Sequence, residues 1–203
     1  MRLEVTVMTF DESEVGRLLE AVEFSAVKHR TQRRKGVEES AYVTHPIQVA
    51  KTLWHEGGVR DLDIIIAGLL HDTIEDTGTT GAEIESGFGK RVRGFVEEVT
   101  DNKEDPKAKR KQDQIDHAHE KSLGAAQIKL ADKINNIRDI TKNPPANWDE
   151  LRKSAYIDWA GSVVAGLPKA NNALEDVFDA VVREAREHLS KTEDTSQSME
   201  ANS

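Results

Sequence analysis

Hydrophobic residues recur at helical spacing along nearly the whole chain, and this spacing limits what the chain can fold into. The first stripe, Val15, Leu18, Val22 and Ala26, follows an i, i+3, i+7, i+11 pattern, which marks one face of an α-helix. Similar stripes continue to Leu189, and neither an internal repeat nor a Pro/Gly/Ser-rich linker separates them. The sequence therefore predicts an all-α protein with a single helical domain.

The expected helices are bounded by residues that cap or break helices. They span about 11–29, 46–57, 61–76, 92–100, 107–119, 125–140, 151–163 and 172–189. Thr80 with Glu83 fits a capping box, and Asn147 with Glu150 resembles another N-terminal cap. We expect residues 1–9 to form an N-terminal extension and 10–189 the domain. Residues 190–203 contain no aromatic residue and one Met, which favours a disordered tail.

The composition of the chain excludes several kinds of site and partner. Its 203 residues include no cysteine, so disulfides, thiolate nucleophiles and cysteine-ligated zinc are absent. No apolar run approaches the roughly 20 residues of a membrane span, and the start, MRLEVTVMTF, lacks the features of a signal peptide. The formal charge of −9 argues against general affinity for nucleic acid, because such binding depends on Lys and Arg.

Two basic clusters stand out in this acidic chain. Residues 28–35 carry five positive charges and no acid, and a second cluster lies at 107–111. Either cluster could be solvated surface. Their concentration, however, favours two places where a polyphosphate is held against the overall negative charge.

The sequence HDTIED at 71–76 places one imidazole and three carboxylates at the end of a strongly apolar segment. If the helix continues to Asp76, Glu75 lies over His71 and Asp76 over Asp72. Like charges at such short range raise one another's pKa unless a cation neutralises them. A divalent metal ion is the simplest remedy.

Two further positions fit the same kind of site. His45 directly precedes Pro46, and Asp132 interrupts the apolar segment IKLADKINNI with Asn136 four residues later. Each residue alone also fits a helix cap or a satisfied polar contact. Together with His71 and Asp72, His45 and Asp132 form a mixed nitrogen and oxygen ligand set. Such a set suits Mn, Fe(II) or Zn and can activate water. The remaining histidines are interpreted as surface or supporting residues: His29, His55, His117, His119 and His188.

Five longer strings narrow the interpretation. They are QRRK (32–35), AYVTHP (41–46), LLHDTIEDT (69–77), VEEVTD (96–101) and IKLADKINNIRD (128–139). In this order they resemble the hydrolase domain of the RelA/SpoT family, and most closely the single-domain Mesh-type small alarmone hydrolases. The resemblance covers roughly residues 10–185. It implies the all-α HD-domain fold of metal-dependent phosphohydrolases.

The resemblance also implies roles for individual residues. The implied cofactor is Mn²⁺, one per chain, with the ligands His45, His71, Asp72 and Asp132. The implied catalytic residues orient or activate water or lie near the scissile phosphate: Glu75, Asp76 and Asn136. The implied substrate contacts hold the nucleotide or its distal phosphates: Arg34, Lys35, Tyr42, Lys107, Arg152 and Tyr156.

The expected activity is Mn²⁺-dependent removal of the 3′-pyrophosphate from the alarmone (p)ppGpp, the nucleotide of the stringent response, which gives GDP or GTP and pyrophosphate. The expected partner is this small nucleotide in the cytoplasm, without nucleic acid or membrane, and a homo-oligomer is compatible with the sequence. One alternative is hydrolysis of another nucleotide, such as the 2′-phosphate of NADPH. A second is a nucleotide-sensing module without hydrolysis, against which the intact acidic pair Glu75 and Asp76 counts.

Overall fold

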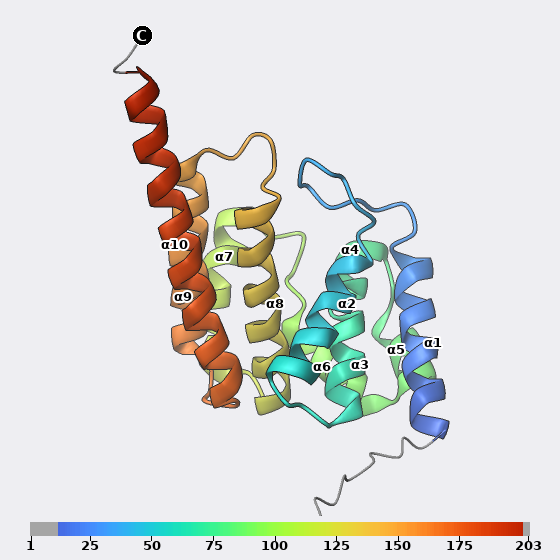
Figure 1. The fold of residues 1–203 in the computed structure, drawn as a ribbon. Helices are drawn as coiled ribbons and strands as arrows, with labels where there is room; N and C mark the ends of the chain where they lie inside the picture. The colour runs from blue at the N-terminus through green and yellow to red at the C-terminus, as the bar shows by residue number, and fades with distance from the viewer. Residues whose placement is uncertain (1–11, 201–203) are drawn as a thin grey trace, which may run out of the picture.

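The structure is a computed structural model that describes residues 12–200, with side chains through Lys191. The expected N-terminal extension 1–9 and residues 201–203 lie outside this range. Between 12 and 200 the chain is helical with no β-strand, and its isolated β-bridge joins Arg33 and Ala41. The prediction of an all-α fold is therefore confirmed (Figure 1).

The helices follow one another with short connections. In chain order they are α1 (Glu12–Lys28), α2 (Thr44–Lys51), a π-helical turn (Thr52–Glu56), α3 (Leu62–Leu70), α4 (Thr73–Thr77), α5 (Gly81–Phe88), α6 (Lys90–Val99), α7 (Lys107–Asp116), a 3-10 turn (Ala118–Glu120), α8 (Leu123–Lys142), α9 (Glu150–Gly166) and α10 (Asn172–Glu200).

Helices α3 and α8 form the centre of the molecule. Every residue from Ile64 to Leu70 in α3 is buried, which explains why this segment is apolar on all sides. Helix α8 packs against α2, α3 and α6 on one side and against α9 and α10 on the other (Figure 1). Its buried face therefore joins the two halves of the helical array, and it carries Asp132 into the core.

The predicted continuous helix over 61–76 is wrong at His71 and Asp72. Helix α3 ends at Leu70, and α4 begins at Thr73. The His71 ring lies with Nδ1 2.9 Å from the Gly68 carbonyl, and the Thr73 hydroxyl donates to the Leu70 carbonyl. These side chains satisfy carbonyls of the last turn of α3, so the chain can turn there without leaving backbone acceptors unpaired.

Other helix ends also differ from the sequence pattern. Asp149 and not Asn147 caps α9, since its side chain accepts from the backbone of Arg152. Helix α7 ends at Asp116, before a separate 3-10 turn, and not at His119. Helix α10 continues to Glu200, beyond the end at about 189 that the hydrophobic spacing predicts. The capping box of Thr80 and Glu83 is confirmed.

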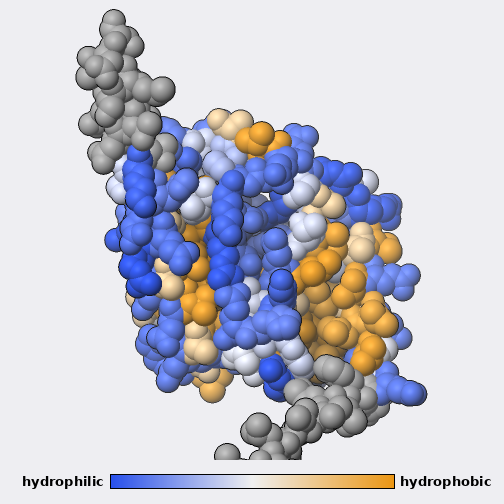
Figure 2. Space-filling model, viewed as in Figure 1, coloured by the Kyte–Doolittle hydropathy of each residue, from blue (hydrophilic) through white to orange (hydrophobic). Residues whose placement is uncertain are grey.

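The loop between α1 and α2 and the loop between α8 and α9 lie at the same end of the molecule, beside α4 (Figure 1). The face in this view is mostly hydrophilic, with hydrophobic residues gathered at the lower right, on the side of α1 to α3 (Figure 2). Among the described residues, no helix has the length and apolar character needed to cross a membrane.

Candidate active site

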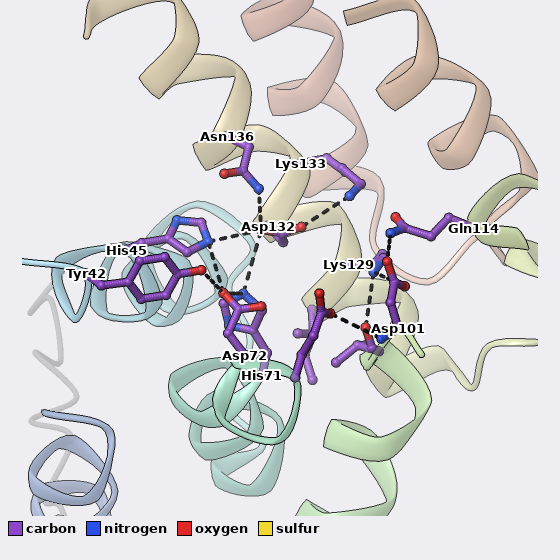
Figure 3. A pocket seen from close by; sticks show the side chains of 13 residues that line it. Tyr42, His45, His71, Asp72, Asp101, Gln114, Lys129, Asp132, Lys133 and Asn136 are labelled. Atoms are coloured by element: carbon purple, nitrogen blue, oxygen red, sulfur yellow. Dashed lines mark hydrogen bonds and ion pairs between the residues drawn. The ribbon is translucent and has the colours of Figure 1, made fainter. Parts of the chain in front are cut away.

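The four residues expected to bind metal converge from three elements. His45 Nε2 lies 3.1 Å from Asp132 Oδ1 and 3.9 Å from Asp72 Oδ2. His71 Nε2 lies 3.0 Å from Asp72 Oδ2 and 3.7 Å from Asp132 Oδ1. Helix α2, the turn after α3 and helix α8 thus bring two imidazoles and two carboxylates to one point (Figure 3). A metal-sized cluster is formed by His45, His71 and Asp72, with Asp132 in contact with both rings.

The orientation of His71 leaves one ring nitrogen available as a ligand. Its Nδ1 lies 2.9 Å from the carbonyl oxygen of Gly68, which can only accept. In the neutral ring the proton therefore sits on Nδ1, and the lone pair of Nε2 points toward the carboxylates. Nε2 is buried without a hydrogen-bond partner. A buried nitrogen of this kind beside two carboxylates fits a bound divalent cation.

The pKa values of the same residues show what the cluster lacks. Burial alone would lower the pKa of His71, but Asp72 and Asp132 outweigh it and raise that pKa to about 10. The two histidines in turn hold the pKa of the Asp72 carboxyl far below its usual range, despite its burial. Burial lowers the pKa of His45. Without metal, a proton on His71 therefore takes the place of a cation, and a metal ion must displace it.

Neighbouring side chains hold the ligand carboxylates in place. The hydroxyl of Tyr42 donates to Asp72 Oδ2 at 2.5 Å. Asn136 Nδ2 donates to Asp132 Oδ1 at 2.6 Å, and its Oδ1 accepts from Arg34 at 3.1 Å. Tyr42, Asn136 and Arg34, which the resemblance relates to the nucleotide, therefore also contact the metal-binding cluster or one another.

The acidic pair lies beside this cluster but each carboxylate has its own partners. Glu75 accepts from the backbone of Asp101 and from Arg110, each at 3.2 Å. Asp76 accepts from Gln32 at 2.8 Å and forms an ion pair with Lys103. Burial, followed by the charge of Asp101, raises the pKa of Glu75. Glu75 is therefore the carboxyl of the pair whose environment favours uptake of a proton.

Three adjoining cavities contain every predicted site residue. The first, of about 150 Å³, is lined by the four expected metal ligands together with Glu75 and Asn136. A larger groove of about 650 Å³ opens beside it and is lined by Arg34, Lys35, Tyr42, Asp76 and Tyr156, among others. The third, of about 360 Å³, is lined by Lys107 and Arg152, and shares Lys35, Arg110 and Tyr156 with the groove.

The third cavity forms a cationic rim, which we define as Lys35, Lys107, Arg110, Lys111 and Arg152. Partial burial and three of these neighbours lower the pKa of Lys107. Aromatic rings support the rim, because the Arg152 guanidinium lies 4.7 Å from the Trp148 ring and Lys111 Nζ lies 4.6 Å from the Trp159 ring. Like charges held this close favour an anionic ligand.

Several side chains that hold the site were not predicted. Gln32, Lys103 and Arg110 contact the acidic pair, and Asp139 pairs with Arg34. Arg110 stands in the basic cluster at 107–111 and Gln32 in the string QRRK, but neither pattern names a partner. The residues of the basic stretch 28–35 do not all face the site. Lys28 pairs with Glu83, whereas Arg34 and Lys35 line the groove.

Comparison with known proteins gives a consistent result. The HD domain family model matches residues 21–157. A mouse protein named guanosine-3′,5′-bis(diphosphate) 3′-pyrophosphohydrolase MESH1 is 48% identical over 172 residues, which cover 85% of this chain and 96% of the relative. The Drosophila melanogaster protein of the same name is 41% identical over 168 residues, which cover 83% of this chain and 94% of that relative.

A solved structure shares the fold. It is described as a metazoan ortholog of SpoT that hydrolyzes ppGpp and plays a role in starvation responses. The two chains are 40% identical and superpose with a TM-score of 0.81, over 87% of this chain and 97% of the other. The matching family model, the curated relatives and this structure agree with the five sequence strings. The chain therefore belongs to the HD domain family and, within it, to the RelA/SpoT-type hydrolases of the MESH1 group.

Proposed function

We propose that this chain is a cytoplasmic, Mn²⁺-dependent hydrolase that removes the 3′-pyrophosphate from (p)ppGpp and releases GDP or GTP. The proposal involves one metal ion per chain and a small nucleotide substrate, with no nucleic acid or membrane as a partner. The observation that carries it is the junction of the His45, His71, Asp72 and Asp132 cluster with a groove and a cationic rim. The relatives named for this activity support the choice of substrate.

The donor set accounts for the metal. Two imidazole nitrogens and two carboxylates suit Mn²⁺, Fe(II) or Zn²⁺ and leave room for other ligands. A bound divalent ion supplies Lewis acidity at a phosphate oxygen and lowers the pKa of water. The side chains that would hold it are already oriented, because Tyr42 and Asn136 each fix one carboxylate.

The remaining residues act on water and on the substrate. Glu75 and Asp76 orient the attacking water and accept its proton, and Asn136 lies near the ribose. Arg34, Lys35 and the cationic rim bind phosphates, where their positive charge offsets the charge that develops on the phosphoryl oxygens. Water forms a new bond to phosphorus, the bond from that phosphorus to the ribose 3′ oxygen breaks, and this oxygen leaves with a proton. The products are GDP or GTP, each with a free 3′ hydroxyl, and pyrophosphate.

The direct test is an assay of purified protein with Mn²⁺ and a panel of substrates. We expect release of pyrophosphate from ppGpp and pppGpp, resolved by chromatography, and loss of this activity with a chelator. NADPH in the same assay tests the alternative of 2′-phosphate hydrolysis. Absence of pyrophosphate release by a preparation that binds Mn²⁺ would contradict the proposal. Tight binding of ppGpp without turnover would indicate a sensing module.

A further inference from the structure

His29 is a buried histidine that the proposed reaction does not use. It follows the last residue of α1 and is 2% exposed. From the sequence alone, His29 is interpreted as a surface or supporting residue. In the structure its ring contacts Tyr42 and Gln32, on the side of the site formed by the loop between α1 and α2.

Gln32 connects His29 to the acidic pair. The backbone nitrogen of Gln32 donates to the His29 carbonyl at 2.9 Å. Its side-chain Nε2 donates to Asp76 Oδ2 at 2.8 Å, and its Oε1 lies 2.7 Å from His29 Nδ1. His29 therefore contacts both the main chain and the side chain of the residue that holds Asp76.

The chemistry of the amide fixes the direction of these hydrogen bonds. An ionised carboxylate only accepts, so the NH₂ group of Gln32 must face Asp76 and its carbonyl oxygen must face His29. His29 must then donate from Nδ1. Its Nε2 is buried without a hydrogen-bond partner. The contact between His29 and Gln32 therefore needs a hydrogen-bond donor at the Nδ1 position, and it needs no partner at Nε2.

The other partner of Asp76 is less constrained. Lys103 forms an ion pair with Asp76, but the lysine side chain is 50% exposed. A long exposed side chain loses rotamer entropy when it is held in one geometry, and its ion pair is screened by salt. Gln32 is held by its own backbone bond and by a buried ring, so it is the more rigid of the two contacts.

The same ring also packs against a residue that supports the metal-binding cluster. The rings of His29 and Tyr42 lie 4.8 Å apart, and Tyr42 donates to Asp72. The backbone nitrogen of Tyr42 donates to the Gln32 carbonyl at 3.1 Å. His29 therefore packs against the residue that holds a metal ligand while it bonds to the residue that holds Asp76.

We propose that His29 and Gln32 are positioning residues: the Nδ1 proton of His29 fixes the Gln32 amide, and the amide fixes the Asp76 carboxylate for the reaction. This inference deepens the proposed function and rests on it, because Asp76 acts there on the attacking water. A misplacement of a reacting group by about 1 Å can cost on the order of 100-fold in rate. The effect should therefore fall on kcat and not on KM.

Three variants separate positioning from a merely structural role. His29→Asn keeps a donor near the Nδ1 position, whereas His29→Leu fills similar space without a donor. Gln32→Glu can still accept from His29 but can no longer donate to Asp76. The exposed His55 provides the matched controls His55→Asn and His55→Leu. Circular dichroism and thermal unfolding of each Mn²⁺-loaded variant establish the folded fraction.

We expect His29→Leu and Gln32→Glu to lower kcat for ppGpp by about 10- to 100-fold, with KM within about threefold of the parent value. His29→Asn should stay within about threefold of the parent in both constants, as should the His55 controls. Equal kcat values per folded molecule for His29→Leu and His29→Asn would overturn the proposal. A rise in KM alone would also overturn it, since Gln32 would then bind substrate directly.

A second measurement does not depend on turnover. Nitrogen-15 NMR of the imidazole rings, without substrate, should show a proton on Nδ1 of His29, and the His29 signals should shift in Gln32→Leu. A ring protonated on Nε2 alone would overturn the inference, because Nδ1 could then not donate to Gln32. If the parent protein hydrolyses nothing, the proposed function fails while this spectrum still tests the contact.

Discussion

At the floor of the site, which we define as His45, His71, Asp72 and Asp132, the two carboxylates lie within 4 Å of two imidazole nitrogens. The cavity of the cationic rim instead gathers five cations around one carboxylate, that of Asp101. The floor can balance its own charge, because the carboxylates raise the pKa of His71 to about 10 and so hold a proton there. At the rim, the neighbours that act on Lys107 are Arg152, Lys35 and Arg110, and all of them lower its pKa.

This difference shows how an acidic protein can bind a polyanion. The floor exchanges one cation for another, a proton for a metal ion, so its ligand is selected by coordination. The rim has an excess of positive charge that an anion relieves, so its ligand is selected by charge. The chain carries a net charge of −9, yet positively charged side chains outnumber carboxylates at the rim.

The largest expected effect comes from the floor. Asp72→Ala removes a carboxylate that faces both His45 and His71, and the remaining groups cannot complete the ligand set. We expect loss of tight Mn²⁺ binding and a fall in kcat of more than about 100-fold, since even residues that only support metal ligands cost about 10- to 100-fold. Calorimetric titration with Mn²⁺ and the ppGpp assay measure the two effects.

Asp158→Asn is the matched control for this change, because Asp158 pairs with Arg186 on the exposed side of α9. It should leave metal binding and turnover unaltered. Normal Mn²⁺ affinity in Asp72→Ala would break the comparison, since selection at the floor would then not depend on coordination by Asp72.

A smaller effect is expected at the rim. Lys107→Ala and Arg152→Ala each remove one positive charge from this cavity, and we expect KM for ppGpp to rise about tenfold with kcat nearly unchanged, as for an interaction made equally in ground and transition states. Lys109→Ala is the control on the same helix, because Lys109 pairs with Asp105 and Asp113.

Salt sharpens this test. Screening weakens interactions between exposed charges, with a Debye length of about 8 Å at physiological ionic strength. KM of the parent protein should therefore rise with salt more steeply than KM of Lys107→Ala. Equal salt dependence in the two proteins would remove Lys107 from phosphate binding.

The sequence could predict the residues of the floor better than the contacts that hold them in place. A His-Asp pair at the end of the apolar run 64–70 is costly unless it is bound, and that cost is visible in the sequence alone. The break between α3 and α4 is not visible, because it depends on bonds from the His71 and Thr73 side chains to carbonyls of the same helix. The spacing of hydrophobic residues predicts which face of a helix is buried, but it does not predict which backbone carbonyls accept hydrogen bonds from side chains.

Contacts between distant elements were equally hidden. Arg110 meets Glu75, and Gln32 meets Asp76, across separations of 35 and 44 residues. His29 is buried beside Tyr42 and Gln32, and nothing in its neighbours along the chain requires that burial. Residue types indicated the chemistry of the site, while the geometry that supports each carboxylate required the fold.

The smallest expected effect is a pH dependence of stability that separates the floor with metal from the floor without it. The pKa of His71 rises from an ordinary 6.5 to about 10 on folding, so the stability that its proton contributes is present below about pH 6.5 and is lost as the pH rises toward 10. Lys133, buried next to Asp132, has its pKa lowered from 10.5 to about 8, and it therefore adds stability as the pH rises above about 8. Between about pH 6.5 and 8, Lys133 does not offset the stability that is lost through His71.

In that window, metal-free protein should lose up to about 1.4 kcal/mol per pH unit, or about 2–4 °C in Tm for each kcal/mol. Above pH 8 the curve should flatten as Lys133 compensates. At saturating metal, Mn²⁺-loaded protein should not show the loss between about pH 6.5 and 8, because the metal has already displaced the proton, and above about pH 8 its stability should rise as Lys133 loses its proton. Thermal unfolding at intervals from pH 6.5 to 10, with chelator and with Mn²⁺, measures both curves. A flat metal-free curve, or parallel curves, would mean that His71 carries no proton at the floor, and the floor would then hold uncompensated negative charge just as the rim holds positive charge.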